Sequence, residues 1–253
     1  MRTALTIAKN TFRQAIRDKI LYGIIIFALL FIGSSVVLSS LSLGEDVFII
    51  RNFGLAGIYL FGIVITIFLG ASIVYKEVEE KITYLLLAKP VTRADIIWGK
   101  FLGLLMAIGT TVLLMVVAYL LIVLISGGII DYAAITAVIL QLAEVALLIS
   151  VLIMFSIFTT PLAATIYTIL ILYIGHLLPL VQEFALKSGK VSKFILLAVY
   201  YIFPNLEKFN VRNLVVHNLP ISFNEVVIPI IYSAAYVTLA LLLAQKLLNR
   251  RDM

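Results

Sequence analysis

Six long apolar segments constrain this sequence more than any other feature. They cover residues 20–42, 53–75, 101–125, 133–155, 159–181 and 226–247. The hydrocarbon core of a bilayer is about 30 Å thick, and a helix crosses it with about 20 apolar residues. Because 63% of the 253 residues are hydrophobic and only 13% are charged, a soluble domain of this size cannot bury the apolar surface. The sequence therefore predicts an all-α polytopic membrane protein with six transmembrane helices, and it excludes a soluble globular fold and a nucleic-acid-binding module.

The distribution of Lys and Arg predicts the orientation of the chain. Basic residues concentrate in cytoplasmic segments of membrane proteins. With the N-terminus inside, 13 of the 19 basic residues fall on the cytoplasmic side. We therefore expect a multi-pass protein of the cell membrane with both termini in the cytoplasm, and we interpret the net charge of +6 as a signature of topology and of contact with membrane lipid.

The chain forms a single transmembrane domain, 1–253, in which three stretches lie outside the spans: 1–19, 76–100 and 182–225. The first of these predicts an interfacial amphipathic helix, with its basic stripe facing lipid headgroups and its apolar side facing down. Such a helix is either an elbow that steers the first span or a simple topogenic anchor. The apolar face contains Ala4, Leu5, Ala8, Phe12, Ala15 and Ile16.

The stretch 182–225 is expected on the extracytoplasmic side. Its apolar run 191–203 has 13 residues, which is too short for a span and is typical of an interfacial or re-entrant helix. Aromatic and Lys side chains accompany this run. They predict either a gate or docking surface for an extracytoplasmic accessory protein, or a lid that shields the ends of the spans.

The stretch 76–100 is predicted to form two helices. Pro90 interrupts the first, at 76–87, and Thr92 with Asp95 resembles a capping box that starts the second. This stretch is either a docking site, with charged contacts and an apolar anchor, or a solvated boundary. The candidate docking residues are Lys76, Glu77, Glu79, Glu80, Lys81, Tyr84, Leu85, Leu86, Pro90 and Arg93.

Glu144 is the one carboxylate placed inside a predicted span, and Gln141 lies one turn away on the same face. An acid in a membrane is costly, so Glu144 is a candidate for a cavity, a proton relay or a substrate contact. It is equally a candidate for a hydrogen bond that joins two helices. Only two His residues and no Cys are present, and this composition predicts no metal site.

The string YKEVEEKITYLLLAKPVTRADIIWGKFLG (75–103) resembles the hallmark of ABC transporter permeases of the second exporter class. The later string IFPNLEKFNVRNLVV (202–216) resembles the branch associated with multicopper-enzyme maturation. The six spans, the N-terminal amphipathic helix and the short re-entrant run also match. The positions that carry the first likeness are Glu77, Glu79, Glu80, Leu85, Leu86, Pro90, Arg93, Gly99 and Lys100.

The resemblance implies a half-transporter whose segment 76–87 is the coupling helix that sits in a groove of a separate ATPase subunit. Two permease copies, as a homodimer, and two ATPase copies would form the working exporter. The chain has no phosphate-binding loop of its own, because Phe101 follows Gly99-Lys100 and Val191 follows Gly189-Lys190. ATP and Mg are therefore expected in the partner, with no cofactor and no catalysis in this chain. The alternatives are a self-sufficient secondary transporter and a membrane assembly factor without an ATPase partner.

Overall fold

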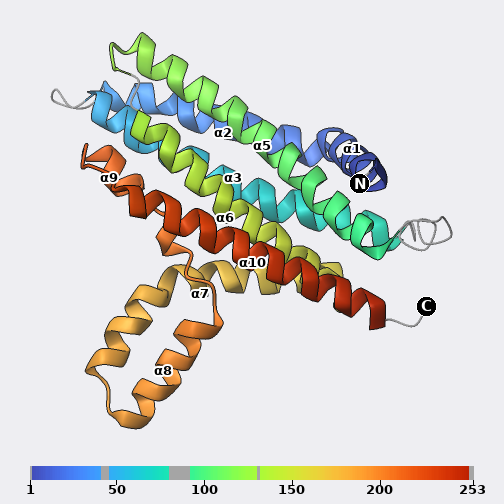
Figure 1. Cartoon of the computed structure of the whole chain (residues 1–253). Helices are drawn as coiled ribbons and strands as arrows, with labels where there is room; N and C mark the ends of the chain where they lie inside the picture. Colours follow the sequence, from blue (N-terminus) through green and yellow to red (C-terminus); the bar gives the residue numbers. More distant parts are fainter. Residues whose placement is uncertain (1, 41–45, 80–91, 130–131, 251–253) are drawn as a thin grey trace.

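The computed structural model describes residues 2–40, 46–79, 92–129 and 132–250, and these residues are almost entirely helical (Figure 1). Six helices are long and apolar enough to cross a membrane, as the sequence predicts. The six spans are α2 (Lys19–Ser39), α3 (Asp46–Glu79), α5 (Arg93–Ile125), α6 (Tyr132–Ser156), α7 (Pro161–Lys187) and α10 (Phe223–Arg250).

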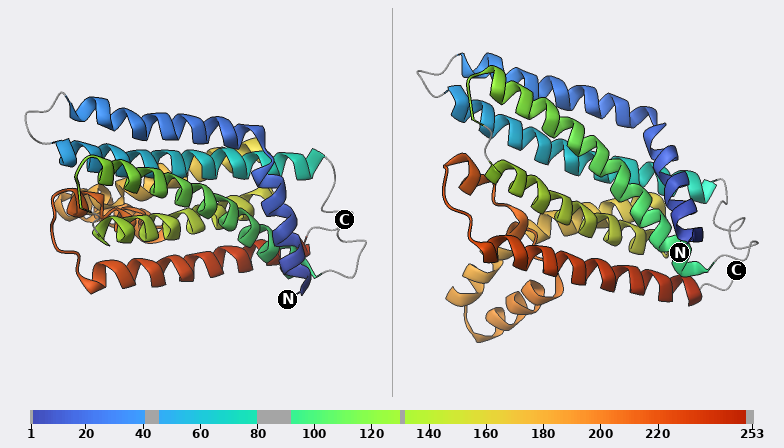
Figure 2. Two further views of the ribbon diagram at one scale, coloured as in Figure 1. Left: turned by 90° about the horizontal axis from the view of Figure 1, so that it is seen from above. Right: turned by 45° about the horizontal axis from the view of Figure 1, so that its top comes forward.

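Both termini lie at the same end of the bundle (Figures 1 and 2). The short helix α1 (Arg2–Ile16), the described end of α3 and the start of α5 lie at this end as well, which we call the terminus end. The opposite end carries α9 (Arg212–Val216) and the turn after α5. There Arg51 of α3 donates hydrogen bonds to Asn218 and to the carbonyl of Ile129, and so joins α3 to two connecting segments.

Helix α3 is the centre of the bundle and contacts α2, α5, α6 and α7. Glycines let its neighbours approach closely, because a Cβ at Gly54 would meet the ring of Tyr119 on α5, and one at Gly57 would meet Phe31 on α2. The helix is also longer than the predicted span 53–75. Residues 76–79 continue it, so no new helix begins at 76: the change from apolar to charged residues does not by itself end a helix.

Helix α5 begins where the sequence predicts. Thr92 is its N-cap, and its side chain accepts a hydrogen bond from the backbone N–H of Asp95 at 3.1 Å. The helix then runs without a break into the third span, so its 33 residues extend about 50 Å.

Helix α1 packs along the start of α5, so its buried face contacts protein and is not simply the predicted apolar face. A Cβ at Gly99 or Gly103 would collide with the backbone of α1, at the carbonyl oxygens of Ala4 and Ala8. Ala8 is fully buried in this contact, whereas Leu5 is 63% exposed. The buried face of α1 is therefore rotated relative to the apolar face predicted from the sequence, because small residues favour close packing of two helices over contact with lipid.

Helix α7 is longer than the predicted span 159–181 and continues eight residues beyond Pro179. It bends near its middle, and α8 (Lys190–Ile202) then runs back beside it as a hairpin (Figure 1). The 13-residue helix α8 coincides with the predicted short apolar run. Its re-entrant position in a membrane stays a prediction.

The chain returns from α8 to the bundle through residues 203–211, which we call the return segment. This segment contains a short 3-10 helix, η1 (Glu207–Phe209), and leads into α9. Leu206 and Phe209 of the return segment belong to the hydrophobic core. Helix α10 then starts with a capping box, in which Ser222 and Glu225 exchange hydrogen bonds, and packs on α6.

Candidate functional site

Glu144 on α6 is fully buried and faces α3 and α7. Its Oε1 atom accepts a hydrogen bond from the hydroxyl of Tyr59 at 3.2 Å and lies 2.9 Å from Nε2 of His176. A charged side chain at the centre of a bilayer costs about 3 kcal/mol or more, so such a group needs partners. Glu144 has them on two neighbouring helices, and it therefore joins α6 to both α3 and α7.

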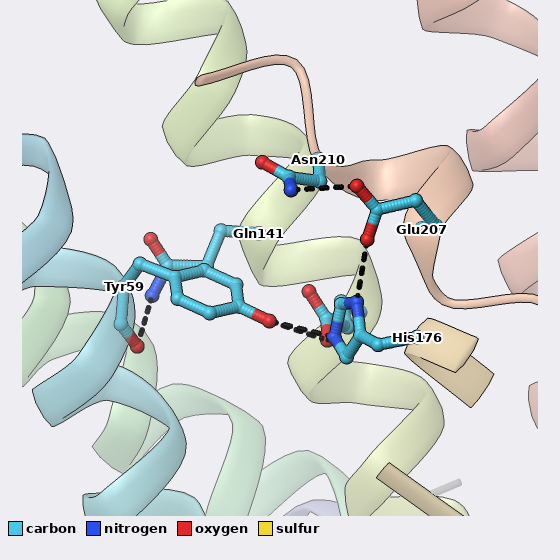
Figure 3. A network of polar contacts seen from close by, with 6 residues as sticks. Tyr59, Gln141, His176, Glu207 and Asn210 are labelled. Atoms are coloured by element: carbon cyan, nitrogen blue, oxygen red, sulfur yellow. Dashed lines mark hydrogen bonds and ion pairs between the residues drawn. The ribbon is translucent and has the colours of Figure 1, made fainter. Parts of the chain in front are cut away.

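His176 is the centre of this cluster. Its Nε2 atom also lies 2.7 Å from the hydroxyl of Tyr59, and its Nδ1 atom lies 2.9 Å from Oε2 of Glu207 in the return segment. Figure 3 shows the ring between Tyr59 on one side and Glu207 on the other. Glu207 in turn accepts a hydrogen bond from the side chain of Asn210 at 2.8 Å. We call Tyr59, Glu144, His176, Glu207 and Asn210 the polar network.

The backbone of α7 explains why Glu207 reaches His176. Proline has no N–H, so Pro179 leaves the carbonyl of Gly175 without its usual partner four residues later. The backbone N–H of Leu206 donates to this carbonyl at 3.2 Å. Gly175 has no side chain to prevent the approach, since a Cβ there would lie 2.7 Å from the carbonyl oxygen of Pro204. The Gly175–Pro179 turn therefore holds the return segment beside His176.

Exposure falls steadily along the network. The side chain of Glu207 is 41% exposed, that of His176 is 24% exposed and that of Glu144 is not exposed at all. The network therefore connects the surface at the opposite end of the bundle to a buried acid between the spans.

Gln141 approaches α3 one turn from Glu144, and its side-chain amide donates to the backbone carbonyl of Ile58 at 2.9 Å. The close approach depends on Gly62, because a Cβ at that position would lie 2.3 Å from the amide nitrogen. Gln141 and Glu144 lie on one helix face and both bond to Tyr59: the amide of Gln141 also donates to its backbone carbonyl at 3.4 Å, and Glu144 accepts from its hydroxyl.

A small open pocket adjoins the network at the opposite end of the bundle. Helices α3 and α6 supply one side of it, through residues that include Leu55, Tyr59 and Gln141. The other side is the end of the return segment and the start of α9. The network thus bonds together the two sides of this pocket.

The residues predicted for ATPase docking are only partly described. Lys76, Glu77 and Glu79 lie on the continuation of α3. Arg93, in the first turn of α5, donates a hydrogen bond to the backbone carbonyl of Leu248 near the end of α10. The remaining predicted residues lie outside the described part of the chain: Glu80, Lys81, Tyr84, Leu85, Leu86 and Pro90.

Sequence reasoning found Glu144 and Gln141 but missed the partners of Glu144. Tyr59 and His176 lie 85 and 32 positions from Glu144, and Glu207, which contacts His176, lies 63 positions away, so no local spacing connects them. One signal was present: a His directly after Gly175 and three residues before Pro179 marks a polar group at a helix bend. Within the described residues, no group of three or more His, Cys, Asp and Glu is placed to hold a metal ion.

Comparison with known families assigns the chain to one of them. The family model described as ABC-2 family transporter protein matches residues 5–253, almost the whole chain. A comparison with curated proteins gives no match. The matched family is a membrane component of transport systems and is generally not itself catalytic, in keeping with the six apolar helices. This chain therefore belongs to the ABC-2 transporter family and is a multi-pass transmembrane permease.

Proposed function

We propose that this chain is the membrane-spanning permease subunit of an ATP-driven exporter, and that two copies form the translocation pathway as a homodimer. A separate ATPase subunit, also in two copies, docks on the 76–100 loop and supplies ATP and Mg. The protein lies in the cell membrane, and both of its termini lie in the cytoplasm. The family match carries this proposal, since ABC-2 permeases associate with ABC ATPases.

The lengths of α3 and α5 support the docking site. They have 34 and 33 residues and so extend about 50 Å each, against about 30 Å for the hydrocarbon core. The described end of α3 and the start of α5 both lie at the terminus end, and most of the predicted docking residues lie between these two points in the sequence. A partner that binds there would press on two rigid helices at once.

The contacts of α5 support transmission of that movement. Arg93 connects the start of α5 to the end of α10, and Gly99 and Gly103 seat α1 against the same part of the helix. Packed elements of this kind move as units between discrete arrangements. A shift of the loop is therefore expected to move α1, α5 and the end of α10 together.

The string 202–216 supports a finer assignment, to the branch associated with multicopper-enzyme maturation. It covers the whole stretch from the end of α8 through the return segment and α9. We infer that an extracytoplasmic accessory protein would meet the permease at this end.

The docking proposal is tested by reversing charge in the loop. Changing Glu77, Glu79 and Glu80 to Lys should abolish co-purification with the co-expressed ATPase while membrane insertion is kept, because acidic contacts become repulsive. The matched control changes Lys187, Lys190 and Lys193 to Glu, at the other end of the spans, and should co-purify normally. Normal co-purification and unchanged substrate-stimulated ATP hydrolysis in the loop variant would contradict the assignment of this loop.

One observation favours a second candidate, a self-sufficient secondary transporter. Such proteins place ionisable groups and broken helices near the middle of the membrane, and the chain has both in His176 with Glu144 and in the bend at Pro179. The two candidates differ in their energy source. Transport by the permease alone in proteoliposomes, driven by an ion gradient and without ATPase, would favour the second.

A further inference from the structure

The contacts of His176 in the polar network depend on how many hydrogens its ring and the two acids carry. A neutral imidazole carries one N–H, whereas an ionised carboxylate only accepts hydrogen bonds. His176 approaches Glu144 through Nε2 and Glu207 through Nδ1, both at 2.9 Å. With a neutral ring and two ionised carboxylates, one of these contacts would place two lone pairs against each other. The geometry therefore requires one hydrogen more than that state supplies.

We propose that the polar network is a proton-binding site, and that one proton taken from the extracytoplasmic water holds the return segment closed on the bundle. The proton enters at the exposed carboxylate of Glu207 and resides on the ring of His176, between the two acids. Only the side from which it arrives rests on the orientation proposed above. The binding itself is a property of the permease alone.

The proton controls the return segment because that segment has few other polar ties to the spans. Its backbone bonds to Gly175 through Leu206 and to the hydroxyl of Tyr232 through Asn205. When the proton leaves, the contact between His176 and Glu207 or that between His176 and Glu144 becomes repulsive. The segment then loosens, and the pocket that it closes against Leu55 and Tyr59 opens.

Groups that can carry charge or titrate near the network come from several of the elements that pack on it. Helix α3 contributes no charge here besides the more distant Arg51, and α10 contributes the ring of Tyr232, over which Lys208 lies at 4.6 Å. The start of α9 contributes Arg212, which faces Tyr59 across the pocket. The described groups near the site that can carry charge or titrate are Tyr59 on α3, Glu144 on α6, His176 on α7, Glu207 and Lys208 on η1, Arg212 on α9, and Tyr232 and Tyr236 on α10.

The chain contains no Cys, so a single introduced thiol can report on the segment. Val211→Cys places the thiol in the return segment at a side chain that is only 5% exposed and lines the pocket. Asn213→Cys, on the exposed face of α9, is the matched control. The ratio of their maleimide labelling rates at each pH removes the pH dependence of the thiol itself. The protein is the purified full-length permease in lipid nanodiscs without ATPase, so the result is independent of the docking proposal.

In the unmodified network, the labelling ratio is expected to rise between about pH 5 and about pH 9, by up to about tenfold per pH unit while the closed segment still holds the proton and opening releases it, and to level off once the closed segment has lost the proton too. Glu144→Gln and Glu207→Gln each add a permanent N–H donor where the proton is needed. Both variants are therefore expected to label slowly at every pH. His176→Leu cannot hold the proton and is expected to label fast at every pH.

A purely structural role predicts a different pattern, in which either Gln variant loses an ion pair and labels faster than the unmodified network. That result would overturn the proposal. A labelling ratio that does not change with pH, or unchanged pH dependence in either Gln variant, would overturn it as well. The Gln variants conserve shape, so the test does not depend on whether His176→Leu folds.

Discussion

At the scale of the residue, the contact between Gly62 and Gln141 shows how a glycine admits a polar group into the bundle. The amide of Gln141 bonds to the carbonyl of Ile58, which belongs to a neighbouring helix. Hydrogen bonds between transmembrane helices contribute about 0.6 kcal/mol on average and up to about 1.7 kcal/mol. Gly62 therefore contributes to stability indirectly, because the absence of a side chain there permits this hydrogen bond.

Gly62→Ala should lower the free energy of unfolding by about 1 kcal/mol, because the new Cβ displaces the Gln141 amide. The same change in a Gln141→Ala background should cost much less. Denaturant titration in mixed micelles measures both values. Gly109→Ala is the control, since a Cβ at Gly109 has open space around it and the variant should be at least as stable as the parent. Equal costs of Gly62→Ala in both backgrounds would contradict the predicted coupling.

Glu144 also shows where residue-level prediction from sequence ends. Its burial follows from its place in an apolar run, and its need for a partner follows from the cost of an acid in a membrane. The identity of the partner does not follow, because His176 meets Glu144 only after α6 and α7 have packed side by side. Glu207 joins only after α7 bends and the chain returns.

At the scale of the element, α7 keeps its helix through Pro179 because the freed carbonyl of Gly175 receives a new donor from the return segment. The bend and the docking of the segment are thus one feature. A straight fifth span that ends near 181 is what the apolar pattern predicts, since apolar periodicity reports which residues face lipid and says nothing of a tertiary donor.

Pro179→Ala should restore the N–H that bonds to Gly175 and should displace Leu206 from this carbonyl. The Val211→Cys reporter is then expected to label about fivefold faster or more, because the return segment opens locally at a lower free energy. Pro161→Ala is the control, since Pro161 is at the start of α7, where an N–H has no helical partner in any case. Labelling at the parent rate in Pro179→Ala would contradict the role assigned to the bend.

The sequence predicts an element well when the residues that determine it lie close together in the chain. The cap of α5 needs only Thr92 and Asp95, which lie three residues apart, and the helix begins there. The packing of α1 has a local signal as well, in the spacing of Gly99 and Gly103, but its meaning depends on Ala4 and Ala8, each 95 residues before the glycine that it meets. The four-residue glycine spacing marks a close helix contact without naming the other helix.

At the scale of the whole molecule, both termini and the helix ends that flank the predicted docking loop lie at one end, and the pocket beside the polar network lies toward the other, next to α9. This arrangement separates the end at which an ATPase partner would drive movement of the helices from the site at which a proton would bind. The six spans between them follow directly from six apolar runs of sufficient length.

The orientation of this layout is testable with two single cysteines. Asn213→Cys on α9 should react with a membrane-impermeant maleimide on intact cells, and Asn10→Cys on α1 should react only after the cells are permeabilised. The expected pattern follows from the concentration of Lys and Arg at the terminus end. Labelling of Asn10→Cys in intact cells, without labelling of Asn213→Cys, would show the opposite orientation.

The seat of α1 on α5 has a consequence for synthesis. The ribosome makes Ala8 95 residues before Gly103, and at about 5–20 residues per second the partner surface appears about 5–20 s later. During that interval, the nascent first helix lacks its main packing partner, although it can already contact α3. We expect its amphipathic sequence to hold it on the lipid surface until the third span is inserted, after which its small residues can pack against Gly99 and Gly103.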